Sequence, residues 1–189
     1  MDRFPSEECF YFVQILQRKK ENPLTQKSGK VVKTYYVYNL DYLDTKKDEI
    51  VKLCTENNAR AYINMNCRNE RSVAFTMLKQ VADAIYNQQY RHISKLYDSC
   101  CGQTCSAQEK LWLIDIDDDN DDDQLLNRVI SYVNAQKPDD TNKVKLIVPT
   151  LHGKHILTIP FDKSKFELEF PNVDLHKDNP TILYCPDLK

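Results

Sequence analysis

The sequence predicts an α+β protein, with helices packed on one face of a sheet. Two observations lead to this fold class. Apolar segments rich in aromatic and β-branched residues stand near both ends of the chain, where hairpin connections join them. Between them, strand patterns alternate with segments whose apolar residues recur at helical spacing.

Seven segments have the composition or the alternation of strands. The residues at even and odd positions of 60–68 differ, with Ala61, Ile63 and Met65 on one side and Tyr62, Asn64 and Asn66 on the other. For these asparagines we expect structural hydrogen bonds rather than a place in a binding cleft. The predicted strands are 9–16, 31–38, 60–68, 111–117, 143–150, 155–161 and 181–185.

Three segments are expected to be helices. The first runs over 46–58 with Thr45 as its N-cap, and the third over 125–135, ended by Lys137-Pro138. The second covers 71–89. Its inner stripe is predicted to consist of Val73, Met77, Leu78, Val81, Ala84 and Ile85.

The length of 189 residues fits a single domain with its own core. We expect a small N-terminal α/β unit over 1–90, followed over 91–189 by the sheet that carries the motifs described below.

No apolar run has the length of a membrane span, and the N-terminus does not have the pattern of a signal peptide. Seven cysteines, an odd number without framework spacing, favour the reducing cytoplasm.

Three of these cysteines, Cys100, Cys101 and Cys105, follow His92 within a segment whose structure the pattern leaves ambiguous. Their spacing matches no standard zinc knuckle, and no fourth ligand is evident. Free thiols in a loop are therefore the expectation here, rather than a zinc site.

The segment Leu111-Trp112-Leu113-Ile114-Asp115-Ile116-Asp117 organises the rest of the chain. Side chains alternate along a strand, so Asp115 and Asp117 point to one face, with Cα atoms roughly 6–7 Å apart. Two carboxylates at this spacing suit a hard divalent cation such as Mg²⁺ or Mn²⁺.

Aspartate occupies seven of the nine positions from Asp115 to Asp123. The later members of this run are expected to form a solvated acidic turn before the next helix. A calcium loop that starts at Asp115 is excluded, because its sixth position is not glycine and Leu126 stands where the bidentate Glu belongs. The chain has a net charge of −2, and without these seven aspartates the remainder is mildly basic, which alone does not predict phosphate binding.

Two histidines, His152 and His155, surround a glycine turn just before an apolar strand, in Thr150-Leu151-His152-Gly153-Lys154-His155-Ile156-Leu157. With the cationic Lys154 beside it, such a histidine is suited to bind a phosphate, while the carboxylates hold a metal ion opposite.

These motifs together resemble the archaeo-eukaryotic primase superfamily, which includes compact primase-polymerases of phages and mobile elements. Leu113-Ile114-Asp115-Ile116-Asp117 resembles its Asp-x-Asp strand, and Gly153-Lys154-His155 its small-x-His motif. Asp174, or alternatively Asp178, resembles the third acidic residue. The likeness covers 111–185 in order and spacing. The chain departs from the family in lacking the Ser-Gly-Arg-Gly segment of many primases and the usual sequence after the third acid.

The resemblance implies an RRM-like catalytic sheet and template-directed nucleotidyl transfer from an NTP or dNTP to a 3′-hydroxyl. Asp115, Asp117 and Asp174 (or Asp178) would hold two Mg²⁺ or Mn²⁺ ions, and His155 (or His152), aided by Lys154, would contact the triphosphate. Arg60 or Arg68 would contact single-stranded nucleic acid. In replication the chain would need partners such as a helicase.

Two other readings of the sequence stay open. A strand that ends in Asp-x-Asp also binds Mn²⁺ and a diphosphate in sugar-nucleotide glycosyltransferases, although no Gly-rich βα half precedes Leu111. Alternatively, the domain is a non-catalytic relative that binds nucleic acid or a partner protein.

Overall fold

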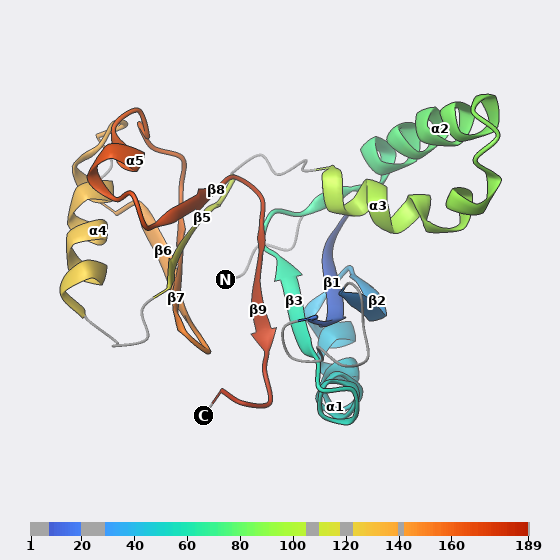
Figure 1. The fold of residues 1–189 in the computed structure, drawn as a ribbon, viewed down its shortest axis with the longest axis horizontal. Coiled ribbons are helices and arrows are strands. Elements are labelled where there is room, and N and C mark those ends of the chain that lie inside the picture. Colours follow the sequence, from blue (N-terminus) through green and yellow to red (C-terminus); the bar gives the residue numbers. More distant parts are fainter. Residues whose placement is uncertain (1–7, 20–28, 105–109, 118–122, 140–141, 189) are drawn as a thin grey trace.

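Two antiparallel sheets form the protein, as seen in a computed structural model that describes residues 8–19, 29–104, 110–117, 123–139 and 142–188 (Figure 1). The α+β class predicted from the sequence is confirmed. Every strand pairing in the described ranges is antiparallel.

The first sheet has the strand order β2-β1-β3-β9, and the short β4 pairs with the first two residues of β1. Its long central strand, β1, pairs with β2 and β3 along the same residues, so that hydrogen bonds flank it on both sides. The bounds of the five strands are β1 (Cys9–Gln17), β2 (Lys30–Val37), β3 (Arg60–Asn64), β4 (Arg68–Asn69) and β9 (Pro180–Tyr184).

The second sheet has the strand order β6-β7-β5-β8. The Asp-x-Asp strand β5 is therefore internal, with β7 on one side and β8 on the other. The bounds are β5 (Trp112–Asp117), β6 (Val144–Thr150), β7 (Gly153–Thr158) and β8 (Asp174–His176).

Helices cover both faces of the first sheet but one face of the second. Along β1, Val13 and Ile15 join the cluster that contains Ile50 and Cys54 of α1 (Leu40–Glu56). The alternate residues Phe10 and Phe12 join a cluster with α2 (Glu70–Tyr86) and α3 (Leu96–Gln103). A 3₁₀ helix, η1 (Tyr90–Lys95), connects these two helices.

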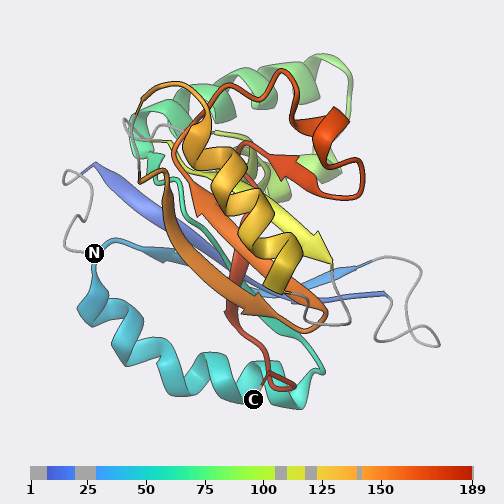
Figure 2. The ribbon, with the colours of Figure 1, turned by 90° about the vertical axis from the view of Figure 1, so that its left-hand side faces the viewer.

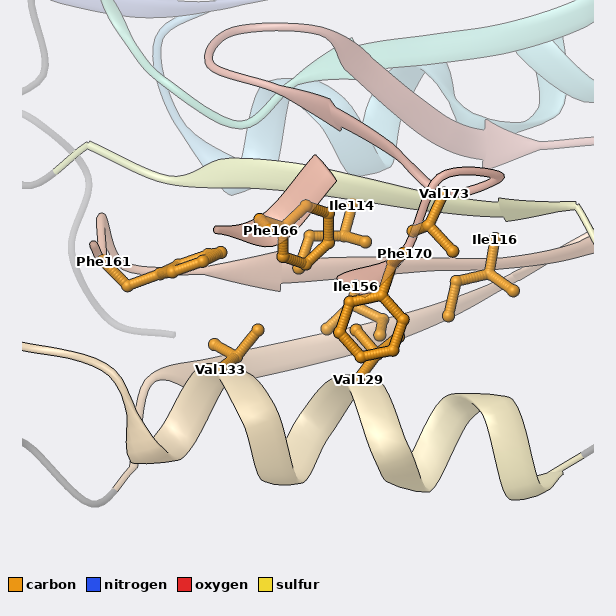
Figure 3. Packing of buried hydrophobic residues seen from close by; sticks show 9 residues of the cluster. All are labelled: Ile114, Ile116, Val129, Val133, Ile156, Phe161, Phe166, Phe170 and Val173. Atoms are coloured by element: carbon orange, nitrogen blue, oxygen red, sulfur yellow. The ribbon is translucent and has the colours of Figure 1, made fainter. Parts of the chain in front are cut away.

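On the second sheet, α4 (Asp123–Ala135) and α5 (Phe166–Glu169) lie on the side away from β9 (Figure 1). The view of Figure 2, turned by a right angle, shows α4 lying across this sheet. Ile114, Ile116 and Ile156 point from the sheet toward Val129 and Val133 of α4 (Figure 3). The opposite face of the second sheet is turned toward β9 of the first sheet (Figure 1).

Helix α1 begins earlier than the sequence analysis predicted. Asn39, not Thr45, is the N-cap, because its side-chain Oδ1 accepts a hydrogen bond from the backbone N–H of Tyr42 at 2.8 Å. Thr45 lies inside the helix, where its hydroxyl donates to the carbonyl of Tyr42. The prediction of Thr45 as the cap was wrong because Asn39 offers an equally good capping oxygen one and a half turns earlier.

The predicted inner stripe of the second helix is partly wrong. Val73 and Ala84 are buried, and Met77 packs against the cluster that contains Val73, but Leu78 and Ile85 are exposed. Around the helix axis, Leu78 and Ile85 lie about a third of a turn from the buried Val73 and Ala84. The apolar residues of α2 thus form two opposite stripes rather than one.

The cysteine segment is helical rather than a loop. Cys100 and Cys101 are buried free thiols in α3, and Cys105 lies outside the described residues. Burial raises the pKa of the Cys101 thiol to about 12, with the negative charge of Asp98 acting in the same direction.

The last strand, β9, returns to the first sheet, where it pairs with β3. A boundary at residue 90 therefore does not separate the two sheets, since the chain crosses between them again after β8. None of the helices in the described part of the chain is long and apolar enough to cross a membrane.

Candidate functional site

The face of the second sheet opposite α4 carries ionisable side chains from three strands. Because Ile114 and Ile116 point to α4, the alternation of β5 directs Asp115 and Asp117 to the opposite side. We call this surface the Asp–His face. Its members are Asp115, Asp117, His155, Asp174 and His176.

Asp115 stands at the centre of this face. In the antiparallel register it lies directly opposite His155 on β7 and directly opposite Asp174 on β8. Residues so paired have Cβ atoms about 4.5–5.5 Å apart. Three residues that are far apart in the sequence therefore form one row across the sheet, and Asp117 lies two residues further along β5 on the same side.

The imidazole of His155 contacts the carboxylate of Asp115, with Nε2 at 3.3 Å from Oδ1. This hydrogen bond is the main cause that lowers the pKa of Asp115, and the nearby charges of His176 and Arg18 lower it further. Burial of Asp115 acts in the opposite direction, but the net shift of its pKa is downward from 3.8, so the side chain is a carboxylate at neutral pH. Asp117 and Asp174 are exposed to solvent.

A hydrogen bond joins the Asp–His face to the first sheet. Nδ1 of the buried His155 lies 2.8 Å from the hydroxyl oxygen of Thr181 on β9. In the tautomer that donates from Nε2 to Asp115, Nδ1 accepts from the Thr181 hydroxyl. Both nitrogens of His155 thus have partners, which fixes the orientation of its ring.

Lys154 does not join this face. It pairs with Ile116 in the register, on the α4 side, and its Nζ lies 2.9 Å from Oδ1 of Asp123 at the start of α4. Adjacent strand residues point to opposite faces, so the neighbour of His155 in sequence is not its neighbour at the site. His152 lies exposed in the turn between β6 and β7, away from the row around Asp115.

Arg68 and Asp178, which the sequence analysis assigned to nucleic acid and metal, bind each other instead. The guanidinium of Arg68 is fully buried, and its Nη2 lies 3.0 Å from Oδ2 of Asp178. Its Nε donates to the carbonyl of Cys101, and its Nη1 to the carbonyl of Asn66. A guanidinium enclosed in this way is not a surface contact for a nucleic acid strand, and Arg60 is also buried.

Asn66 completes this second cluster. Its side-chain amide accepts from the backbone N–H of Leu111 at 2.7 Å and donates to the carbonyl of Leu111 at 2.8 Å. It also donates to Oδ1 of Asp178. We call Asn66, Arg68 and Asp178 the polar joint, because they bind the segments through which the chain enters the second sheet and leaves it again.

Three residues near Asp115 were not predicted from the sequence: Arg18, His176 and Thr181. The Asp174-Leu175-His176 alternation repeats the spacing of Asp115-Ile116-Asp117 and was a usable signal. Arg18 follows the end of β1 and Thr181 belongs to β9, so both reach Asp115 or His155 only through the packing of the two sheets.

Comparisons with protein-family models, with curated proteins and with solved structures found no match. Among the residues that the structure describes, no group of three or more His, Cys, Asp or Glu side chains is placed so as to hold a metal ion. The middle of the acidic run, residues 118–122, lies outside the described residues, as do the aspartates within it.

Proposed function

We propose that this protein is a template-directed nucleotidyltransferase of the primase-polymerase type, with the Asp–His face as its active site. One observation carries the proposal: Asp174, Asp115 and His155 form a single row across three strands, with Asp117 beside it. These residues occur in the chain in the order of the primase motifs. Their pairing across the sheet is a separate observation, because a sequence motif does not specify which strands pair. On this proposal the second sheet is the RRM-like catalytic sheet.

Asp115, Asp117 and Asp174 offer the carboxylate oxygens that a hard divalent cation prefers, and two of the three are exposed. Binding of an ion would require these side chains to turn toward one another from their positions in this structure. Mg²⁺ or Mn²⁺ bound to them would lower the pKa of a 3′-hydroxyl and neutralise charge on the triphosphate. The carboxylates of this chain would hold the metal and thereby position the two reacting groups.

The cationic and imidazole groups would bind the nucleotide. His155 donates to Asp115 in this structure, and the same Nε2–H is suited to a phosphate oxygen when Asp115 turns toward a metal ion. Thr181 holds the ring in place during that exchange. Arg18, whose charge acts on Asp115, is the residue we assign to the triphosphate in place of Lys154.

A second candidate function is supported by the burial of His155. With Asp115 on one nitrogen and Thr181 on the other, this histidine is also what a purely structural link between two sheets would look like. On that reading the domain binds nucleic acid or a partner without chemistry. The antiparallel pairing throughout the described strands gives the glycosyltransferase alternative no comparable support.

Primer extension on a single-stranded template tests the proposal. The wild-type protein is supplied with Mn²⁺ and with either NTPs or dNTPs, and is compared with Asp115→Asn/Asp117→Asn. We expect the double variant to lose on the order of a hundredfold or more in rate, as expected when charge stabilisation of a transition state is removed.

Asp187→Asn is the matched control, because it removes one exposed carboxylate that lies outside the paired strands and outside the Asp–His face. Its rate should equal that of the wild type. Equal rates in the double variant and the wild type would end the catalytic assignment. Absence of extension by the wild type, together with retained binding of single-stranded DNA, would favour the non-catalytic alternative.

A further inference from the structure

Helix α2 has an exposed apolar stripe opposite the side that packs on the rest of the protein. Figure 1 shows α2 at the periphery of the molecule, with α3 beside it and the second sheet far away. The stripe repeats at positions i, i+3, i+7, i+10 and i+11, which share one side of an α-helix. Its members are Phe75, Leu78, Ala82, Ile85 and Tyr86.

The exposure of these side chains is high. Phe75 is 63% exposed, Leu78 67% and Tyr86 88%, and Tyr90 of η1 follows at the end of the stripe with 61%. An aromatic residue presents roughly 150–250 Å², so the three aromatic residues alone expose roughly 300–500 Å². That is already as large as the largest apolar patch of a typical monomer, roughly 300–600 Å².

We propose that this stripe is the interface of a two-fold symmetric dimer, in which α2 packs antiparallel against α2 of a second copy. Leu78 and Ile85 enlarge the aromatic area toward the roughly 800 Å² that each partner buries in a stable complex. This inference goes beyond the proposed function and does not depend on it.

The stripe is self-complementary in the antiparallel direction. When two copies cross near Val81, Phe75 of one copy lies beside Tyr86 of the other, and Leu78 beside Ala82. Small Ala82 opposite larger Leu78 lets the two helices approach closely. A two-fold axis repeats each of these contacts, as an isologous interface requires.

The charges along one flank of the stripe favour the same arrangement. Lys79 and Asp83 are exposed and adjacent to the stripe on the same side of α2. A two-fold axis between antiparallel helices brings equal flanks together, so Lys79 of each copy faces Asp83 of the other. Parallel packing about a two-fold axis would instead bring opposite flanks together, so Lys79 and Asp83 of the two copies would not face each other.

Sedimentation velocity over a range of protein concentrations tests the dimer. We expect the wild-type protein to approach twice its mass of 22.2 kDa, and Leu78→Glu to sediment as a monomer. A buried charge at the centre of the interface should raise the dissociation constant at least about a hundredfold. Leu168→Glu, at an 84% exposed position of α5, is the matched control and should remain dimeric.

A charge exchange tests the orientation. Lys79→Glu alone should weaken the dimer, because two carboxylates then face each other across the interface, and Lys79→Glu with Asp83→Lys should restore it. A wild-type protein that is monomeric at every concentration would overturn the proposal, as would a dimer that Leu78→Glu leaves intact. A dimer that Leu78→Glu dissociates but the double exchange does not restore would overturn the antiparallel arrangement.

Discussion

The polar joint and the Asp–His face are two places where acidic and basic side chains from distant segments meet, and they differ in how far they are enclosed from solvent. In the joint, the guanidinium of Arg68 is fully buried, and Asp178 and two backbone carbonyls bind it. On the face, Asp115 is half-buried and its neighbours Asp117 and Asp174 are open to solvent. The enclosed cluster holds the two segments together, whereas on the proposed function the exposed carboxylates of the face are available for a ligand.

The largest expected effect is a loss of stability when the polar joint is disrupted. Asp178→Ala leaves the charge of Arg68 buried without its partner, which should lower the free energy of unfolding by about 3–5 kcal/mol. Asp115→Asn should lower it by no more than about 1 kcal/mol, because a half-exposed carboxylate is still hydrated. Denaturant titration measures both. Similar losses in the two variants would contradict the division into a structural cluster and a ligand site.

Asn66→Ala should have the next largest effect. It removes both hydrogen bonds to the backbone of Leu111 and leaves those groups without their side-chain partner, at a cost of about 2–3 kcal/mol in unfolding free energy. Asn64→Ala is the control, since Asn64 makes one long bond of 3.4 Å to the carbonyl of Asp178. Equal denaturation midpoints for the two variants would show that Asn66 does not hold Leu111 in place.

Arg18→Ala and Lys154→Ala test which of these two cations contacts the triphosphate at the Asp–His face. Arg18 acts electrostatically on Asp115, whereas Lys154 binds Asp123 on the α4 side. On the proposed function, Arg18→Ala removes a charged hydrogen bond to the triphosphate and should raise the KM for the nucleotide about tenfold. Lys154→Ala should change the KM by less than about twofold. The reverse ranking, in steady-state extension assays, would return the triphosphate contact to Lys154.

The smallest effect concerns the first sheet and appears only in alkali. Burial and a hydrogen bond to Asp98 raise the pKa of Tyr36 well above the ordinary value of 10.0. The folded protein therefore binds this proton more tightly, and the resulting stabilisation is complete below pH 10.0 and declines as the pH rises beyond that value. The difference in unfolding free energy between the wild type and Tyr36→Phe should shrink over that range. A difference independent of pH would show that the phenol is not linked to folding.

Much of the local structure was predictable from the sequence. Residues 9–16 and 125–135 form the expected strand and helix because a short-range pattern decides each of them. The predictions were wrong where the sequence offered two similar candidates for the same structural role. Asn39 precedes Thr45 as a cap, and the two stripes of α2 look alike until the packing of Val73 shows which one is inside.

For the candidate site, the sequence indicated the residues but not their grouping. Asp115 and His155 meet because β5 pairs with β7, and Asp174 joins them through β8. Lys154 and Arg68 looked suitable by charge alone, yet the alternation of β7 turns one toward α4, and burial encloses the other. Arg18 and Thr181 had no signal in the sequence, because their place depends on how the two sheets pack.

The most direct test of the central claim is the anomalous scattering of Mn²⁺ in crystals grown with a nucleoside triphosphate. We expect a manganese peak within coordination distance of Asp115 and at least one of Asp117 and Asp174, and we expect the triphosphate to lie near His155. Manganese bound elsewhere, with the Asp115–His155 contact intact and the face free of nucleotide, would contradict the proposed active site.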